Sequence, residues 1–394
     1  MRFLKRSLLV WVASAAALPM AYSASVEAPA GFDDLTNGFV IQAQFDQDRE
    51  IFEEREGLAD GLGPVYNAQS CAECHQNPVT GAASQVTEVR AGHYDVRGGF
   101  REHPGGSLIH DRAIAAHMQE RVLPGYEVRS LRVSLNVLGD GFVECIADET
   151  LAAIARAQPW SMRGQLVQVP VLEAGNVLRT GRFGWKNQHA SLVSFSADAY
   201  LNEMGITSPL LSVDNTSNGA VVSDGIADPE DDGDDIEVFA EFMRATKAPA
   251  RDGVRAGTPA AQAGSATFGA LGCAVCHVRS IATAPAGTVI NGGAFIVPDA
   301  LGDKVIHPFS DFLLHDVGTG DGVVQNGPPS TRNKLRTPPL WGLRARGRLM
   351  HDGLSLTVPD AILRHGREAG QAALLYRTLP GPGKDELLAF LASL

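Results

Sequence analysis

The sequence is poor in cysteine and in clustered positive charge, and beyond its first two dozen residues it lacks any long apolar run. It has five cysteines in 394 residues, and its 33 Lys and Arg are outnumbered by 45 Asp and Glu. Nucleic-acid binding needs clustered basic side chains that neutralise phosphates, so no nucleic-acid partner is expected. A membrane span needs about 20 apolar residues in a row, so none is expected after the N-terminal segment.

The one long apolar run lies at the N-terminus and has the features of an export signal. Three basic residues within the first six positions precede an apolar run over 8–18, and Ala21 and Ser23 are spaced like the small residues before a cleavage site. Residues 1–23 are therefore predicted to be a signal peptide, with Ala24 as the first mature residue. The alternative is an uncleaved anchor, for which the run is short. The signal predicts a periplasmic location.

Four of the five cysteines fall in two copies of the pattern C-x-x-C-H, which are Cys71, Cys74 and His75, and Cys273, Cys276 and His277. This pattern is the attachment signature of c-type haem. The two cysteines of each copy form thioethers to one porphyrin, and the adjacent histidine gives the iron its proximal imidazole. The sequence thus predicts two covalently bound c-type haems.

A redox pair, a zinc site and chance fit the two patterns less well than haem attachment does. A thioredoxin-like redox pair uses C-x-x-C but does not require the histidine. A Cys₄ zinc site would have to join two pairs that are roughly 200 residues apart, which is long for a zinc ribbon. Two chance occurrences of a five-residue pattern with so few cysteines are rare.

Apolar periodicity predicts a mainly α fold with two cytochrome c-like haem domains and a β-rich insertion between them. Helices are expected at 45–57, 106–122, 236–249, 260–271 and 383–394, two of them shortly before the haem motifs. In the segment 106–122, His110 and His117 would share one helical face. Over 126–190, Val and Leu nearly alternate with polar residues between Gly and Pro turns, which predicts short strands.

These patterns divide the mature chain into four parts. The expected parts are a first haem domain over 24–125, the β-rich insertion over 126–200, an acidic loop and helical connection over 201–255, and a second haem domain over 256–394.

The acidic part is dense in carboxylates, which are Asp224, Asp228, Glu230, Asp231, Asp232, Asp234 and Asp235. Hard oxygen ligands at this density can hold Ca²⁺, but their spacing does not match an EF-hand loop. We favour a solvated acidic loop that leads into a helix N-terminus, where negative charge is stabilising.

Several stretches are similar to a known family. Before the first haem motif these are Gly61 to Pro64 with Asn67. Later stretches are NVLGDGFVE (136–144), GRFGWKNQ (181–188), NEMGITSPL (202–210), LLHDVG (313–318), RTPPLWGL (336–343), MHDG (350–353) and AILRHG (361–366). From about residue 30 to its end, the chain resembles the di-haem oxidoreductase family, often labelled thiol-oxidoreductase-like, within the wider di-haem cytochrome c peroxidase group.

The resemblance implies a periplasmic redox protein with two cytochrome c-like domains that face each other. One haem would take electrons from a donor protein, such as a small cytochrome or cupredoxin, and the other would meet peroxide. The peroxidases place a Met or Tyr iron ligand just before the segment that looks like LRTPPL, but here that position is Asn333. A carboxamide is a poor haem ligand, and we interpret Met350 as a packing residue. The second haem is therefore expected to lack a strong sixth ligand.

Two further departures concern activity. The tryptophan–aspartate–glycine–arginine stretch and following glutamate of the peroxidases are absent. The thiol label has no support either, because Cys145 is the only unassigned cysteine and is more typical of a small buried side chain in a strand.

The residues expected beside the haems follow from these stretches. His93, 18 positions after His75, is the predicted sixth ligand of the first haem. The catalytic candidates are His315, His351 and Trp185. The Trp185 indole could lie between the two haems and assist electron transfer, or it could simply pack in the core.

Basic side chains are expected to meet the haem carboxylates. Arg336 is the predicted propionate contact, with Lys186 as a second candidate. For His189, hydrogen bonding around a haem and iron ligation both stay open, and for Trp341 we expect core packing.

The sequence leaves three functions open. The first is a peroxidase-like enzyme that reduces a small oxidant. The second is a non-enzymatic electron carrier in which both irons are six-coordinate. The third is a partner in metal handling or protein maturation. The sixth ligand of each iron separates the first from the second.

Overall fold

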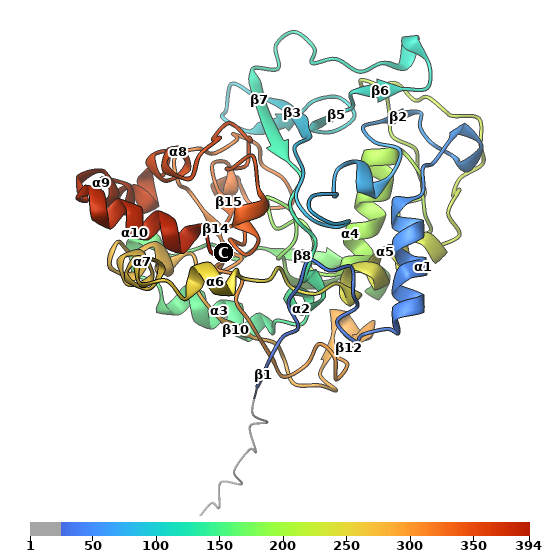
Figure 1. The fold of residues 1–394 in the computed structure, drawn as a ribbon. Helices are drawn as coiled ribbons and strands as arrows, with labels where there is room; N and C mark the ends of the chain where they lie inside the picture. The colour runs from blue at the N-terminus through green and yellow to red at the C-terminus, as the bar shows by residue number, and fades with distance from the viewer. Residues whose placement is uncertain (1–24) are drawn as a thin grey trace, which may run out of the picture.

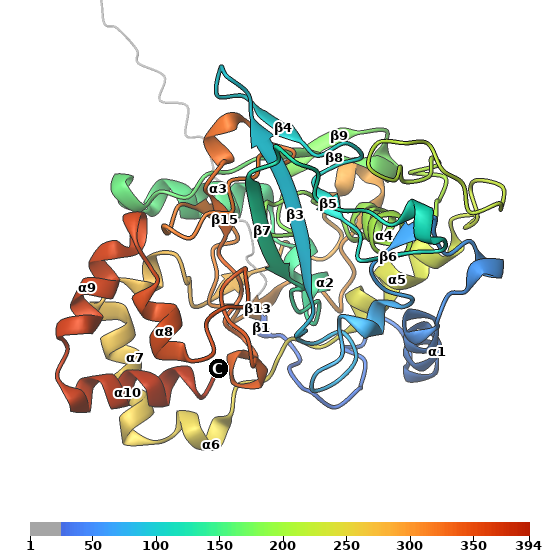
Figure 2. The same cartoon turned by 90° about the horizontal axis from the view of Figure 1, so that it is seen from above.

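The computed structural model describes residues 25–394, so the predicted signal peptide over 1–23 lies outside the described residues. Two groups of helices lie at opposite sides of the molecule in both views, with strands and long loops between them (Figures 1 and 2). Within residues 25–394, no helix is both long enough and apolar enough to span a membrane.

One group consists of α1 (Gln42–Glu53), α4 (Leu192–Ala199) and α5 (Asp234–Ala245). The first turn of α5 contains three acidic residues and its last turn contains Arg244, so its charges complement the helix dipole. Phe52 of α1 packs on Phe242 of α5, with ring centroids 4.6 Å apart. This packing places the end of α1 beside the first haem motif.

The other group consists of α6 (Gly253–Ala256), α7 (Pro259–Ala270), α8 (Val358–Leu363), α9 (Gly370–Thr378) and α10 (Gly381–Leu391). The Thr258 side chain caps α7, and Pro259 occupies its first turn, where a missing N–H costs nothing. A Cβ at Gly264 would collide with the Glu386 carbonyl, so this glycine lets α7 and α10 pack closely.

The strands are short. They are β1 (Val26–Glu27), β2 (Val65–Tyr66), β3 (Thr87–Tyr94), β4 (Phe100–Glu102), β5 (Leu108–Ile109), β6 (Arg112–Ala113), β7 (Val128–Val133), β8 (Gln168–Val171), β9 (Val177–Thr180), β10 (Ile281–Ala282), β11 (Val289–Ile290), β12 (Phe295–Ile296), β13 (Lys304–Ile306), β14 (Leu314–His315) and β15 (Leu335–Arg336). The longest pair is antiparallel, β3 with β7, and β4 and β5 also pair with β3.

The predicted mainly α class is wrong, because the fold is mixed α and β, with 34% of residues in helices and 16% in strands. Helices were correctly predicted at α1, α5, α7 and α10, and strands at β7, β8 and β9. The strands within 87–113 and the two-stranded sheets other than β8–β9 were not predicted, because most of these strands are too short to show periodicity.

The helix predicted over 106–122 is also wrong. The segment contains β5, β6 and one 3-10 turn over Ala116–Met118. Glu120 accepts hydrogen bonds from both the backbone N–H and the Nδ1 of His110, at 2.8 and 2.7 Å. This contact folds the segment back on itself, so His110 and His117 do not share a helical face.

Strand pairing and a shared apolar core connect the two sides of the molecule. β1 pairs in parallel with β13, so the start of the described chain lies against the segment that follows the second haem motif. The largest apolar core contains Phe52 and Phe142 together with Ile281 and Leu313. The three boundaries proposed from the sequence within the mature chain stay predictions, and contacts in this core cross them.

Candidate functional site

The two C-x-x-C-H motifs have matching surroundings. Each begins with a 3-10 turn, over Cys71–Glu73 and Cys273–Val275. A phenylalanine from the preceding α-helix lies against each motif histidine. Phe52 and His75 have ring centroids 6.4 Å apart at 57°, and Phe268 and His277 have centroids 6.3 Å apart at 55°. The chain thus builds the same local arrangement twice.

Each motif faces its own cavity. Cys71, Cys74 and His75 line the first cavity, which has about 1180 Å³ of space free of protein atoms, its open mouth included. Cys273, Cys276 and His277 line the second, with about 1490 Å³ counted in the same way. Both cavities have mainly apolar walls, as expected for sites that enclose a large planar cofactor.

Both motif histidines are neutral. Burial lowers the pKa of His75 and of His277 to about 4. His277 Nδ1 lies 2.9 Å from the Phe309 carbonyl oxygen, which can only accept, so Nδ1 carries the proton and Nε2 keeps its lone pair. A hydrogen bond of this kind orients a metal-binding imidazole.

The cysteines are not joined to one another. None of the five cysteines is in a disulfide. Burial raises the pKa of Cys74 to about 12 and of Cys273 to about 11. Cys145 is fully buried at the end of the short helix α2 (Asp140–Glu144) rather than in a strand, and burial also raises its thiol pKa. A buried, protonated thiol is a poor nucleophile, so Cys145 gives no support to a thiol-redox activity.

A single wall separates the two cavities. Residues 133–136, Trp185 and Arg336 line both of them. The Trp185 indole donates a hydrogen bond to the Val133 carbonyl at 2.8 Å, and its own carbonyl accepts from the Arg336 N–H at 2.8 Å. These bonds fix Trp185 between the end of β7 and β15.

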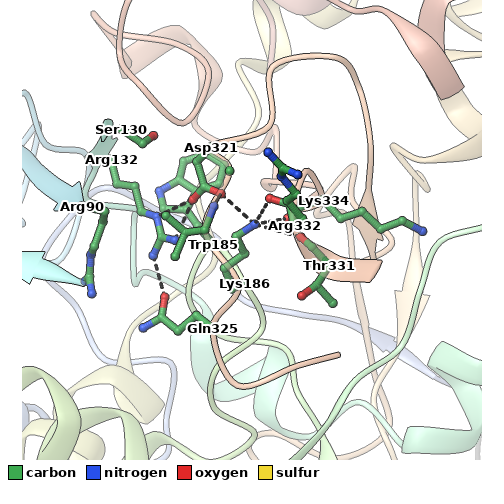
Figure 3. A network of polar contacts seen from close by, with 12 residues as sticks. Arg90, Ser130, Arg132, Trp185, Lys186, Asp321, Gln325, Thr331, Arg332 and Lys334 are labelled. Carbon is green, nitrogen blue, oxygen red and sulfur yellow. Dashed lines mark hydrogen bonds and ion pairs between the residues drawn. The ribbon is translucent and has the colours of Figure 1, made fainter. Parts of the chain in front are cut away.

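A buried ionic network holds this wall in place (Figure 3). Asp321 accepts two hydrogen bonds from Arg132, at 3.0 and 2.7 Å, and its other oxygen lies 2.8 Å from Lys186 Nζ. Lys186 also donates to the Thr331 and Lys334 carbonyls, at 3.0 and 2.8 Å. Lys186 is therefore part of this network. It lines neither cavity, so it is not placed to meet a haem propionate.

The first cavity contains a cluster of ionisable groups. Glu88, Arg90, Arg132 and Glu203 all line it. Arg90 donates to Glu88 through two nitrogens, at 2.8 and 3.1 Å. Burial and the neighbouring Glu88 carboxylate raise the pKa of Glu203, whereas Arg90 holds the pKa of Glu88 low despite its burial. The pKa values of the two carboxyl groups are thus shifted in opposite directions, upward for Glu203 and downward for Glu88.

The second cavity contains histidines instead. Beside His277 it is lined by His315, His351 and His365. His315 has both nitrogens engaged, Nε2 with Asp311 at 2.8 Å and Nδ1 with Glu368 at 2.7 Å. Burial alone would lower the pKa of His315, but these carboxylates raise it to about 12. His315 is therefore a buried imidazolium and not a free ligand.

The His351 ring is buried and edge-on to Trp185, with centroids 6.1 Å apart. Its Nδ1 has no hydrogen-bond partner among residues 25–394, and burial lowers its pKa to about 4. His351 thus lies next to the shared wall, as a neutral imidazole.

Two guanidinium groups fit the carboxylates of haem. Arg336 Nε and Arg346 Nη2 are buried and have no hydrogen-bond partner among the described residues. Both side chains line the second cavity, and Arg336 lines the first as well. Neither group forms an ion pair within residues 25–394, although Arg336 Nη1 donates to the Arg182 carbonyl at 2.6 Å. A buried guanidinium without a counter-charge is costly unless an anion meets it, so the residues present fit haem propionates. The sequence singled out Arg336 but gave no signal for Arg346.

Some predicted residues lie elsewhere. His93 lines neither cavity. Its neighbours on β3, Glu88 and Arg90, point into the first cavity, and His93 is an odd number of positions away, on the opposite face of the strand. There its ring packs on Tyr126 at 5.0 Å. Asn333 is absent from the lining of the second cavity.

The remaining candidates have structural partners. His189 Nε2 lies 3.0 Å from Asp198 at the edge of the first cavity. Trp341 lies in the largest core and lines neither cavity.

The acidic segment brings three carboxylates together. Oxygen atoms of Asp214, Asp228 and Glu230 lie within 4.8 Å of one another. Such clusters are common on solvated loops, so calcium stays a prediction.

Residues 110–394 match the family described as "Di-haem oxidoreductase, putative peroxidase". None of the curated proteins matches the chain. The solved structures that are similar at low identity include the following three. A hydrazine synthase of Kuenenia stuttgartiensis has 15% identity and a TM-score of 0.41, covering 99% of this chain and 100% of its own. A MauG-like protein associated with microbial copper homeostasis has 15% identity and a TM-score of 0.44, covering 96% and 95%. The diheme peroxidase BthA from Burkholderia thailandensis has 16% identity and a TM-score of 0.42, covering 89% and 86%.

The family match spans most of the chain, including the second motif, the shared wall and most of the stretches that carry the sequence resemblance. The chain therefore belongs to the di-haem oxidoreductase family.

Proposed function

We propose that this protein is an exported c-type di-haem oxidoreductase that passes electrons between two covalent haems and reduces a small oxidant at the first of them. One observation carries the proposal. Two cavities, each lined by one C-x-x-C-H motif, meet at a wall made by residues 133–136, Trp185 and Arg336. A shared wall of this kind gives electrons a short path between the cofactors.

Each haem would have its own motif. Cys71, Cys74 and His75 would hold one, and Cys273, Cys276 and His277 the other. Arg336 and Arg346 would pair with propionates. When bound, the haems supply one-electron chemistry at iron.

The oxidant is assigned to the first cavity because its polar groups suit peroxide. Reduction of hydrogen peroxide to two waters consumes two electrons and two protons. Glu203 carries a proton in a buried site and can donate it to a departing hydroxide, while solvent supplies the second. Arg90 and Arg132 place positive charge where negative charge develops. From the position of Asn333, the sequence had suggested that the second haem binds the oxidant. Asn333 does not line the second cavity, however.

Location and partner are part of the same proposal. The basic, apolar and small-residue pattern over 1–23 supports export. c-type haem is attached outside the cytoplasm, which agrees with a periplasmic protein. A small cytochrome or cupredoxin would then be the electron donor.

Haem stoichiometry tests the proposal. A pyridine haemochrome assay of exported protein is expected to give two covalent haems per chain. The double variant Cys71→Ala/Cys74→Ala is expected to lose one, and so is Cys273→Ala/Cys276→Ala. Cys145→Ala is the matched control and should keep both. One haem in the fully matured wild type would contradict the proposal.

A further inference from the structure

The second cavity contains three histidines besides the motif histidine His277, and they differ in which ring nitrogens are free. An iron ligand needs one nitrogen with an available lone pair and, as a rule, a hydrogen bond from the other nitrogen that fixes the ring. This requirement separates His315, His351 and His365.

His315 does not meet the requirement, because Asp311 and Glu368 occupy both of its nitrogens. His351 meets it only in part. Its Nδ1 has no partner among the described residues, so nothing orients the ring for ligation.

His365 meets the requirement in full. Its Nδ1 lies 2.8 Å from the Ala361 carbonyl oxygen. A carbonyl only accepts, so Nδ1 donates and the lone pair of the neutral ring is on Nε2. His277 has the same arrangement toward Phe309 at 2.9 Å. Both rings line the one cavity. These two histidines therefore present the same tautomer to the same space.

The backbone on both sides of His365 is held in place. Arg364 donates to Asp352 and to the Ser355 hydroxyl, the latter at 3.0 Å. The Gly366 N–H donates to the Val317 carbonyl at 2.7 Å, and Val317 itself lines the cavity. Asp352 belongs to the MHDG stretch, so this stretch anchors the residue next to His365.

We propose that His365 Nε2 is the sixth iron ligand of the second haem, which is then a six-coordinate, low-spin, bis-histidine site. This rests on the proposed function, since it requires a haem at the second motif. The second haem would then relay electrons, which leaves the first as the haem that meets the oxidant.

The test uses exported wild-type holoprotein whose haem content is first measured as two per chain. A lower content would contradict the proposed function and is thus distinguishable from a failure of this inference. Near-infrared magnetic circular dichroism and EPR of the oxidised protein are then recorded. The bis-histidine charge-transfer band is expected in the wild type, and its absence from the wild type overturns the inference even if every variant misfolds.

Three variants sharpen the test. In His365→Ala, one of the two haems is expected to change from low to high spin, and added imidazole should restore the low-spin signal. His351→Ala, in the same cavity, is the matched control and should keep the wild-type bands. His365→Met should stay low-spin with a raised reduction potential, because thioether ligation raises haem potentials. A His365→Ala protein with two haems and wild-type bands would refute the assignment, as would loss of the band in His351→Ala alone.

Discussion

At the scale of single residues, the first cavity contains two carboxyl groups whose pKa values are shifted in opposite directions. Glu88 is held ionised by Arg90, and the nearby negative charge together with burial keeps Glu203 protonated. Asn67 fixes the orientation of Glu203 through a hydrogen bond to Oε2 at 2.7 Å. Two titratable groups whose environments push their pKa values apart are the pattern of an acid–base site.

Glu203→Gln is expected to lower kcat/KM for hydrogen peroxide by about 100-fold or more, the usual worth of a positioned general acid. In the wild type the rate should fall as the pH rises through the elevated pKa of Glu203, because the proton donor is then lost. This alkaline fall should vanish in the variant. The exposed Glu54→Gln is the control. An unchanged rate with an unchanged alkaline limb in Glu203→Gln would exclude this role.

His315 illustrates a different residue-scale effect, on stability. Removing one partner of a buried charge cluster usually costs about 3–5 kcal/mol, so His315→Gln is expected to lower the free energy of unfolding by about 3 kcal/mol. The folded pKa of His315 is raised above its unfolded value. Its stabilisation is therefore complete below about pH 6.5 and is lost as the pH rises toward the folded pKa of about 12.

Denaturant unfolding of the holoprotein at several pH values checks this effect. The difference between wild type and His315→Gln should narrow in alkaline solution. Glu27→Gln, which breaks the exposed pair with His307, is the control and should leave stability unchanged. If His315→Gln and the wild type had the same free energy of unfolding at neutral pH, the charge cluster around His315 would not stabilise the fold.

At the scale of elements, the central contact joins β7, the turn at Trp185 and the long segment between β14 and β15. Arg132 reaches Asp321 from the end of β7, and Lys186 reaches Asp321 and the Thr331 carbonyl from the turn (Figure 3). All three charged side chains are buried. The network therefore decides where the 316–334 segment and the shared wall lie.

Lys186→Met should leave Asp321 short of one cation and three carbonyls without their donor. The expected result is faster amide hydrogen exchange over 318–334 and a loss of about 3 kcal/mol in unfolding free energy. Lys247→Met, which removes an exposed pair with Asp33, is the matched control. Unchanged exchange over 318–334 in Lys186→Met would show that the network does not hold the segment.

The sequence predicts these elements unevenly. Helices α1, α5, α7 and α10 have long apolar faces and were found. The two-residue strands β14 and β15 were not, because they are set by tertiary pairing rather than by a local pattern. The prediction of a helix around His110 was wrong for a related reason. The contact between the His110 and Glu120 side chains outweighs the local helical pattern.

At the scale of the whole molecule, the site is built from distant parts of the chain. The two C-x-x-C-H motifs are visible in the sequence, because attachment chemistry requires a fixed local spacing. The residues proposed to act beside the irons are not. Glu88 and Glu203 meet across more than a hundred positions, and His365 reaches its cavity from the end of α8. His93 has suitable spacing from His75 but lies on the wrong face of β3.

EPR of the oxidised holoprotein, with two covalent haems confirmed and cyanide then titrated in, tests most directly whether the two haems have different roles. We expect one high-spin haem that cyanide converts to low spin and one low-spin haem that does not respond. Replacing Cys71 and Cys74 by Ala should remove the responsive signal, which assigns it to the first cavity. Two low-spin haems that ignore cyanide in both oxidation states would contradict the proposed division of roles and identify the protein as an electron carrier.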